Sequence, residues 1–159
     1  MEDVPWLSPP QLRAWMRFVA VVELLPGVLD SQLQRDADVS HFEYYVLAML
    51  SEAPNATLRM TALSLKTNAT LPRLSHVIKR LESRGLVRRA PCPEDRRATN
   101  ASLTEEGIVL VVATAPGHVR TVRENVINRL TEEQIGQLDA ISDQLLRRLD
   151  PDNRMNPPA

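Results

Sequence analysis

The sequence predicts a single, mainly α-helical domain that carries one small β-hairpin. Its 159 residues, of which 43% are hydrophobic and 25% charged, match one compact domain with its own core. Apolar residues recur at intervals of three and four near both ends of the chain, which is typical of long amphipathic helices. Between these ends, two short β-forming runs separated by a proline-rich loop predict the hairpin.

The first long helix is predicted over residues 9–35. Its apolar seam has helical spacing, at Leu12, Trp15, Val19, Val22, Leu29 and Leu33. Pro26 and Gly27 interrupt this pattern. Because proline lacks a backbone N–H and its ring clashes with the preceding turn, we expect the helix to kink or split there.

The middle of the chain, residues 40–103, is predicted to form a module of helices followed by the hairpin. Ser40 and Glu43 have the spacing of a capping box, which opens a helix that ends before Pro54. A short helix is expected over residues 60–66, where apolar residues again recur at helical spacing.

Thr70 is expected to cap the next helix, with Pro72 in its first turn and Gly85 after its end. Residues 86–89 and 99–103 are the predicted strands of the hairpin. The loop between them is rich in proline and charged residues, and we expect it to form the tip of a wing.

The second long helical region is predicted over residues 104–149. Thr104 caps its first helix, Pro116 and Gly117 are expected to bend or break that helix, and Thr131 and Gln134 form a capping box for the last helix. Residues 150–159 are expected to fray.

The long helices at the two ends expose more apolar surface than the module at residues 40–103 can cover. A symmetric second copy would cover it, so the sequence predicts a homodimer. The alternative is that the helices fold back on their own domain.

Charge is distributed unevenly along the chain, although the net charge is only −1. The window from Arg59 to Arg97 contains ten basic and three acidic residues and so carries +7, whereas the remainder carries −8. A local cationic surface on an otherwise anionic protein is suited to binding phosphate. The alternative interpretation is a solvated basic face with no partner.

The helix after Thr70 has two contrasting faces. Leu74, Val77, Ile78 and Leu81 fall on one stripe and are expected to face the core. The opposite face is cationic and hydrogen-bonding, which fits the major groove of double-stranded DNA. The candidate DNA-binding residues of this helix are Thr70, Pro72, Arg73, His76, Lys79 and Arg80, and all but Thr70 are assigned to base reading. An ordinary amphipathic helix with a solvated face is the alternative.

The hairpin supplies a second set of cationic side chains. Arg96 and Arg97 are placed to enter the minor groove, whose negative potential attracts arginine. Asp95 is expected to pair with one of these guanidinium groups and fix its direction. Arg88 and Arg89, on the first strand, are expected to neutralise backbone phosphates.

Three runs of sequence resemble the MarR family of winged helix-turn-helix regulators: LESRGLVRR at 81–89, DRRA at 95–98 and LTEEG at 103–107. The resemblance implies a dimer that reads a near-palindromic operator, usually as a repressor. It also makes the helix over residues 70–84 the recognition helix, and Asp95 and Arg97 the wing motif. The chain departs from the family pattern in Ala62-Leu63-Ser64 of the short helix and, more strongly, in Pro116-Gly117.

Many members of that family release DNA when a small aromatic or lipophilic effector binds between the dimer helices and the DNA-binding module. Aromatic side chains with a few polar groups are typical of such pockets, and the candidates are Trp15, Phe18, His41, Tyr44 and Tyr45. The alternative is that these aromatic residues belong to the core.

The sequence offers no sign of catalysis, a metal site or a cofactor. His41, His76 and His118 lack metal-ligand spacing, and no phosphate-binding glycine loop or nucleophile motif is present. Cys92 lies between two prolines without a resolving cysteine, which disfavours a redox sensor. We therefore expect no enzyme, and no cofactor.

The single cysteine and the absence of a leader-like start predict a cytoplasmic protein, and the longest apolar run, residues 108–115, is too short to span a membrane. The leading hypothesis is a homodimeric, DNA-binding repressor that responds to a small molecule. Its alternative is a dimeric small-molecule-binding or interaction module that binds DNA only weakly and without specificity.

Overall fold

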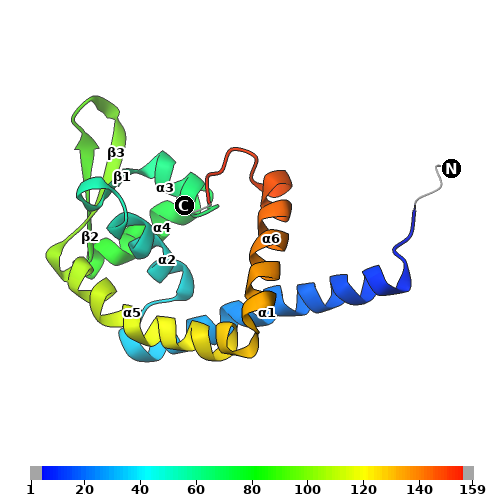
Figure 1. Ribbon diagram of the computed structural model, residues 1–159. Coiled ribbons are helices and arrows are strands. Elements are labelled where there is room, and N and C mark those ends of the chain that lie inside the picture. The colour runs from blue at the N-terminus through cyan, green and yellow to red at the C-terminus, as the bar shows by residue number, and fades with distance from the viewer. Residues whose placement is uncertain (1–4, 156–159) are drawn as a thin grey trace.

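The computed structural model of the protein describes residues 5–155 and is mainly helical (Figure 1). A three-stranded antiparallel sheet in the order β1-β3-β2 accompanies the helices. The elements in chain order are α1 Pro9–Ala37, α2 His41–Ser51, the 3-10 turn η1 Pro54–Ala56, β1 Thr57–Arg59, α3 Met60–Lys66, α4 Leu71–Ser83, β2 Val87–Cys92, β3 Asp95–Leu103, α5 Glu105–Asn125, the 3-10 turn η2 Ile127–Arg129 and α6 Glu132–Leu149.

The core lies in the module from α2 to β3, closed on one side by the ends of α1 and α5. The apolar residues expected to face inward from α4, Leu74, Ile78 and Leu81, are completely buried, and Val77 packs partly buried against the same core. Their partners on the other elements, Leu33, Val39, Val46, Leu47, Leu50, Leu63 and Ala101, are equally inaccessible.

Helix α1 is continuous through Pro26, so the predicted split there is wrong. Helix α5 runs unbroken through Pro116, so the predicted break there is wrong too. Both prolines are exposed, so water can solvate the carbonyl that loses its intrahelical donor. At such an exposed position a long helix can continue past a proline.

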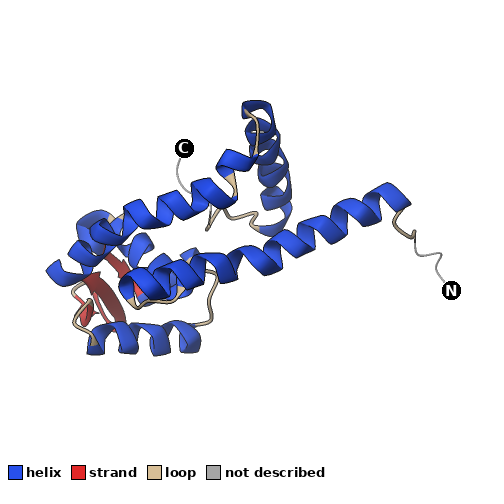
Figure 2. Ribbon diagram, turned by 90° about the horizontal axis from the view of Figure 1, so that it is seen from below, coloured by secondary structure: helices blue, strands red, loops and turns tan. Residues whose placement is uncertain are grey.

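The long helices α1 and α5 lie side by side, and the N-terminal half of α1 projects beyond the rest of the molecule (Figure 2). At their contact, the carboxylate of Asp36 lies so close to Gly117 that a Cβ atom there would be 2.9 Å from Asp36 Oδ2. Gly117 thus allows α1 and α5 to approach. Gln32 extends the contact, since its Nε2 donates to Asp36 Oδ2 at 2.7 Å.

Strand β1 was not expected from the sequence. It pairs with β3, with Leu58 opposite Ala101, and the hydroxyl of Thr57 donates to Ser102 Oγ at 2.8 Å. The hairpin strands β2 and β3 are also longer than predicted and meet at a short turn around Pro93 and Glu94. The wing is therefore a regular ladder nearly to its tip.

The tail that follows α6 begins with an ordered turn. Asp150 is buried, and its carboxylate accepts a hydrogen bond from Met155 N at 2.8 Å and from Arg154 Nε at 3.1 Å. Residues 150–155 thus form a hydrogen-bonded turn, and the fraying expected for residues 150–159 stays a prediction. The remaining part of that prediction, residues 156–159, lies outside the described residues.

Candidate nucleic-acid interface

Helix α4 has a buried side and an exposed polar side. Its first turn is capped by Thr70, whose hydroxyl accepts a hydrogen bond from Arg73 N at 3.4 Å. The candidate DNA-binding residues of this helix are all solvent-exposed: Thr70, Pro72, Arg73, His76, Lys79 and Arg80.

A tight turn joins α3 to α4, as in a helix-turn-helix. Asn68 has a left-handed backbone with φ 47°, which asparagine adopts more readily than most residues. The amide of Ala69 donates to Ser64 O at 2.9 Å, and the Tyr45 hydroxyl donates to Lys66 O at 3.2 Å. Tyr45 therefore supports the end of α3 from α2.

Two charged side chains of α4 reach neighbouring helices. Arg80 Nε lies 3.1 Å from Glu43 Oε1 of α2, and this glutamate is almost completely buried. Arg84 donates to the carbonyl oxygens of Asp38 at 2.5 Å and Ala37 at 3.3 Å, which lie at the end of α1. Guanidinium groups thus attach the helix to α2 and to α1.

A second ion pair attaches α4 to the wing. Arg89 NH2 lies 2.7 Å from Glu82 Oε2, and the Arg89 amide donates to Glu82 Oε1 at 3.0 Å. Hydrogen bonds from the Arg89 side chain are the main reason that the pKa of Glu82 lies below its usual value. The wing strand β2 therefore has a fixed position relative to α4.

The tip of the wing carries Arg96 and Arg97, both exposed. Asp95 Oδ1 accepts a hydrogen bond from the backbone amide of Arg97 at 3.0 Å, and no ion pair joins Asp95 to a guanidinium group within residues 5–155. The predicted Asp95–guanidinium pair is therefore wrong for this structure. Asp95 shapes the turn instead.

Cys92 is the last residue of β2 and lies buried in the wing hairpin. The side chain is 2% exposed, and its thiol donates to Glu94 Oε2 at 2.8 Å. That hydrogen bond is the main reason that the pKa of Glu94 lies below its usual value. A buried thiol engaged as a donor has the character of a structural cysteine.

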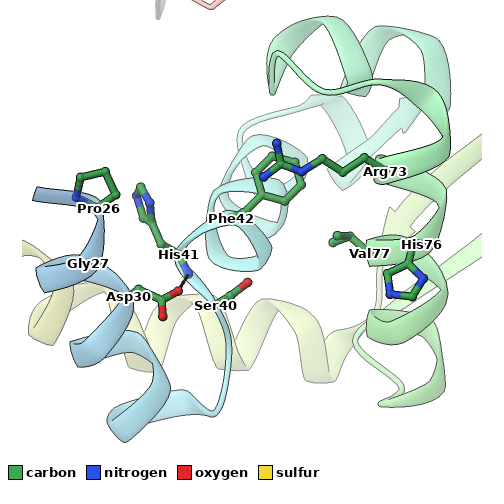
Figure 3. Close-up of a pocket in the computed structure, with 9 residues that line it drawn as sticks. All are labelled: Pro26, Gly27, Asp30, Ser40, His41, Phe42, Arg73, His76 and Val77. Atoms are coloured by element: carbon green, nitrogen blue, oxygen red, sulfur yellow. Dashed lines mark hydrogen bonds between the residues drawn. The ribbon is translucent and has the colours of Figure 1, made fainter. Parts of the chain in front are cut away.

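A groove of about 740 Å³ lies between α1, α2 and the recognition-type helix α4 (Figure 3). Arg73 places its guanidinium carbon 4.2 Å from the centre of the Phe42 ring, and His41 N donates to Asp30 Oδ1 at 2.8 Å. The groove is lined by Pro26, Gly27, Asp30, Ser40, His41, Phe42, Arg73, His76 and Val77. Two candidate DNA-reading residues, Arg73 and His76, therefore also face this groove.

The structure does not bring the five candidate effector residues into one pocket of a single chain. Only His41 lines the groove of Figure 3. Tyr44 is buried, and Tyr45 contacts α3. Trp15 and Phe18 are exposed on the projecting half of α1, with ring centroids 6.3 Å apart.

A histidine pair lies where α2 meets α5. The rings of His41 and His118 have centroids 6.4 Å apart, and Tyr44 lies 4.9 Å from His118. Burial lowers the pKa of both histidines. The nearby Asp30 carboxylate partly opposes this decrease for His41, whereas the neighbouring His41 lowers the pKa of His118 further. Burial also raises the pKa of Tyr44. Sequence spacing gave no signal for this pairing, because residues 41 and 118 meet only in the folded chain.

The described residues hold no group of three or more His, Cys, Asp or Glu side chains arranged for a metal ion. Within residues 5–155, none of the helices combines the length and apolar character needed to cross a bilayer.

Known proteins share both the sequence and the fold. A model of the MarR family matches residues 37–98. The transcriptional regulator PrsX of Escherichia coli is 30% identical over 112 residues, which cover 70% of this chain and 67% of PrsX.

Two solved structures from Streptomyces coelicolor are closely similar. Sco3205, a MarR family transcriptional regulator solved in complex with DNA, is 42% identical, with a TM-score of 0.90 over 95% of this chain and 94% of its own. AbsC, another MarR family regulator, is 35% identical, with a TM-score of 0.87 over 92% of this chain and 98% of its own. Because it has a helix-turn-helix and a wing and shares sequence and fold with these relatives, the chain belongs to the MarR family of winged-helix, DNA-binding transcriptional regulators and is not an enzyme.

Proposed function

We propose that the protein is a homodimeric repressor that binds a near-palindromic operator and is released from it by a small-molecule effector. The proposal depends on two features that occur together. Helix α4 is anchored by the buried Leu74 and Ile78 and is polar on its exposed side, and the tip of the wing carries exposed arginines. Such a helix fits the major groove while the wing reaches the minor groove. The relative Sco3205, which was solved with DNA, supports it.

The cations of this surface differ in how free they are to meet DNA. Arg80 and Arg89 already pair with carboxylates, whereas the described residues give Lys79, Arg88 and Arg97 no acidic partner. We assign base reading to the exposed face of α4, and phosphate and minor-groove contacts to the wing. These residues are Thr70, Pro72, Arg73, His76, Lys79, Arg88, Arg96 and Arg97.

Uncovered apolar surface supports the dimer. Leu24 on α1 is 70% exposed and Leu149 on α6 is 73% exposed, although both are aliphatic. Large apolar side chains left exposed in such number indicate an interaction site. Others on the same two helices are Leu12, Trp15, Met16, Phe18, Val21, Val22, Leu138, Ile141 and Leu145.

The groove between α1, α2 and α4 supports an effector response. It combines the aromatic ring of Phe42 with the cationic Arg73, a chemistry suited to a small aromatic or lipophilic acid. Because Arg73 and His76 belong to both the groove and the DNA-reading face, a ligand bound there competes with DNA for the same side chains.

A gel-shift titration on the DNA upstream of the protein's own gene tests the proposal. We expect complexes that resist competitor DNA and survive moderate salt, because specific contacts add to phosphate binding. Binding that is equally weak on unrelated duplexes and vanishes uniformly with salt would favour the alternative, a small-molecule-binding or interaction module.

Arg97→Ala tests the wing. We expect the affinity for the upstream duplex to fall roughly tenfold, the scale of one lost specific contact, with the dimer still folded. Arg35→Ala, which removes an exposed arginine of α1 outside the cationic window, is the matched control and should leave binding unchanged. Unaltered affinity in Arg97→Ala would remove the wing tip from the interface.

A further inference from the structure

Glu43 is the most deeply buried carboxylate among the described residues, and two contacts occupy it. Its side chain is 2% exposed, Oε2 accepts a hydrogen bond from Ser40 N at 2.7 Å, and Oε1 lies 3.1 Å from Arg80 Nε. The salt bridges of the described chain give Glu43 no other cation. A buried carboxylate is seldom tolerated without such a partner.

Arg80 has the opposite environment. Its side chain is 53% exposed, and it lies on α4 among the residues whose polar face suggests DNA reading. If Arg80 left Glu43 to bind a phosphate, the buried Glu43 carboxylate would lose its cation. The free-energy penalty of that loss is larger than the gain from a phosphate contact that solvent screens. We therefore expect the pair to persist when DNA is bound, with Arg80 held toward Glu43.

Glu43 also links the start of α2 to the orientation of α4. Ser40 and Glu43 cap each other reciprocally, since Ser40 Oγ accepts from Glu43 N at 3.1 Å while the Glu43 carboxylate accepts from Ser40 N. The capping box fixes the carboxylate, and the carboxylate fixes Arg80. Together with the buried Leu74, Ile78 and Leu81, this link sets the rotation of α4 about its own axis.

We propose that Glu43 is a positioning residue for DNA recognition and that Arg80 is its strut, which orients α4 without contacting DNA itself. This inference rests on the proposed function, and it removes Arg80 from the base-reading set that the sequence suggested. The sequence could not show this, because Glu43 and Arg80 are far apart in the chain and meet only in the packed module.

Glu43→Gln gives the first test, because the two roles of Arg80 predict opposite signs. If Arg80 is a strut, the neutral isostere releases it, and affinity for the upstream duplex falls about tenfold while affinity for a random duplex of equal length hardly changes. If Arg80 contacts DNA, the variant frees a cation and removes a negative charge, so both affinities hold or rise. That second result would overturn the proposal. Ser40→Ala, which removes the cap but keeps the ion pair, separates the contribution of the capping box.

The salt dependence of binding gives the second test. The slope of log K against log[salt] is negative, and each lost phosphate contact reduces its magnitude by about 0.9. Arg88→Gln, at an exposed wing arginine, should show this reduction, whereas Arg80→Gln should keep the wild-type slope and lose specificity. A slope in Arg80→Gln that falls as in Arg88→Gln would contradict the strut.

The double variant Glu43→Gln/Arg80→Gln completes the set. Its loss of specific affinity should be close to that of either single variant, because the two residues act as one unit; additive losses would contradict the coupling. All titrations are made below the unfolding temperature of every variant. If Arg80→Gln, which leaves the buried Glu43 carboxylate without its cation, does not fold, the double variant takes its place in the slope comparison with Arg88→Gln, and Arg80→Lys serves as the charge-retaining variant.

Failure of the proposed function has a distinct result. If the wild type itself does not discriminate between the upstream and random duplexes, the repressor proposal fails. The strut is then tested by the same double-variant cycle in thermal unfolding, where additive changes would refute it.

Discussion

Alanine at Gly107 should destabilise the protein, although alanine is the better helix former. Gly107 is buried in the first turn of α5, and a Cβ atom there would overlap the carbonyl oxygen of Leu86 and lie 3.0 Å from Leu103 Cδ2. The carbonyl cannot move freely, because it accepts a hydrogen bond from Thr104 N at 3.1 Å. Helix propensity favours alanine by about 1 kcal/mol, whereas forcing backbone apart costs roughly 3 kcal/mol. The net loss should be about 2 kcal/mol.

Two other helical glycines provide matched controls. At Gly117 a Cβ atom meets only side-chain ends, Asp36 Oδ2 at 2.9 Å and Gln32 Nε2 at 3.3 Å, which can shift. Gly117→Ala should therefore be nearly neutral. At Gly136 nothing lies within 4 Å, so Gly136→Ala should gain up to about 1 kcal/mol from helix propensity.

Urea unfolding at one fixed protein concentration measures the three free energies, since a dimer's stability depends on concentration. The expected order of stability is Gly136→Ala, then wild type and Gly117→Ala together, then Gly107→Ala. A Gly107→Ala protein as stable as the wild type would refute the steric reasoning. A loss of stability in Gly136→Ala would indicate instead that a second copy covers α6.

Two further predictions concern the core and pH. Ile78→Ala, which empties a fully buried site on the inner side of α4, should cost about 2–5 kcal/mol in urea unfolding, and a smaller loss would mean that the site collapses. His118 has a pKa lowered from 6.5 by burial and by His41, so below pH 6.5 the unfolded chain binds more protons than the folded one. Stability should fall as pH drops from 7 to 5, and His118→Gln should flatten this decline; an equal decline in both proteins would rule out His118 as a source.

The helix starts were predictable because they depend on neighbours in the chain. Ser40, Thr104 and Thr131 each cap their helix as the sequence suggested, with the side-chain oxygen accepting from a backbone amide three residues on. The inward stripe of α4 was predictable for the same reason, since helical periodicity is local.

The features that the sequence missed depend on tertiary packing or on solvent. Pro26 and Pro116 do not end their helices, because long helices hold them at exposed positions. Strand β1 has three residues, too few for a visible alternation. The partners of Arg80 and Arg89 were missed because a cationic side chain carries no sign of which carboxylate it will meet.

Arg84 has a wider consequence for a dimer of this protein. Its guanidinium binds the carbonyl oxygens of Ala37 and Asp38 at the end of α1, so α1 is joined to the end of α4 next to Gly85, which has a left-handed backbone with φ 73°. In the proposed dimer, the distance between the two α4 helices would then depend on the angle between α1 and α4. Substitutions that repack α1 would therefore change the operator spacing that the dimer fits, without altering any residue assigned to base reading.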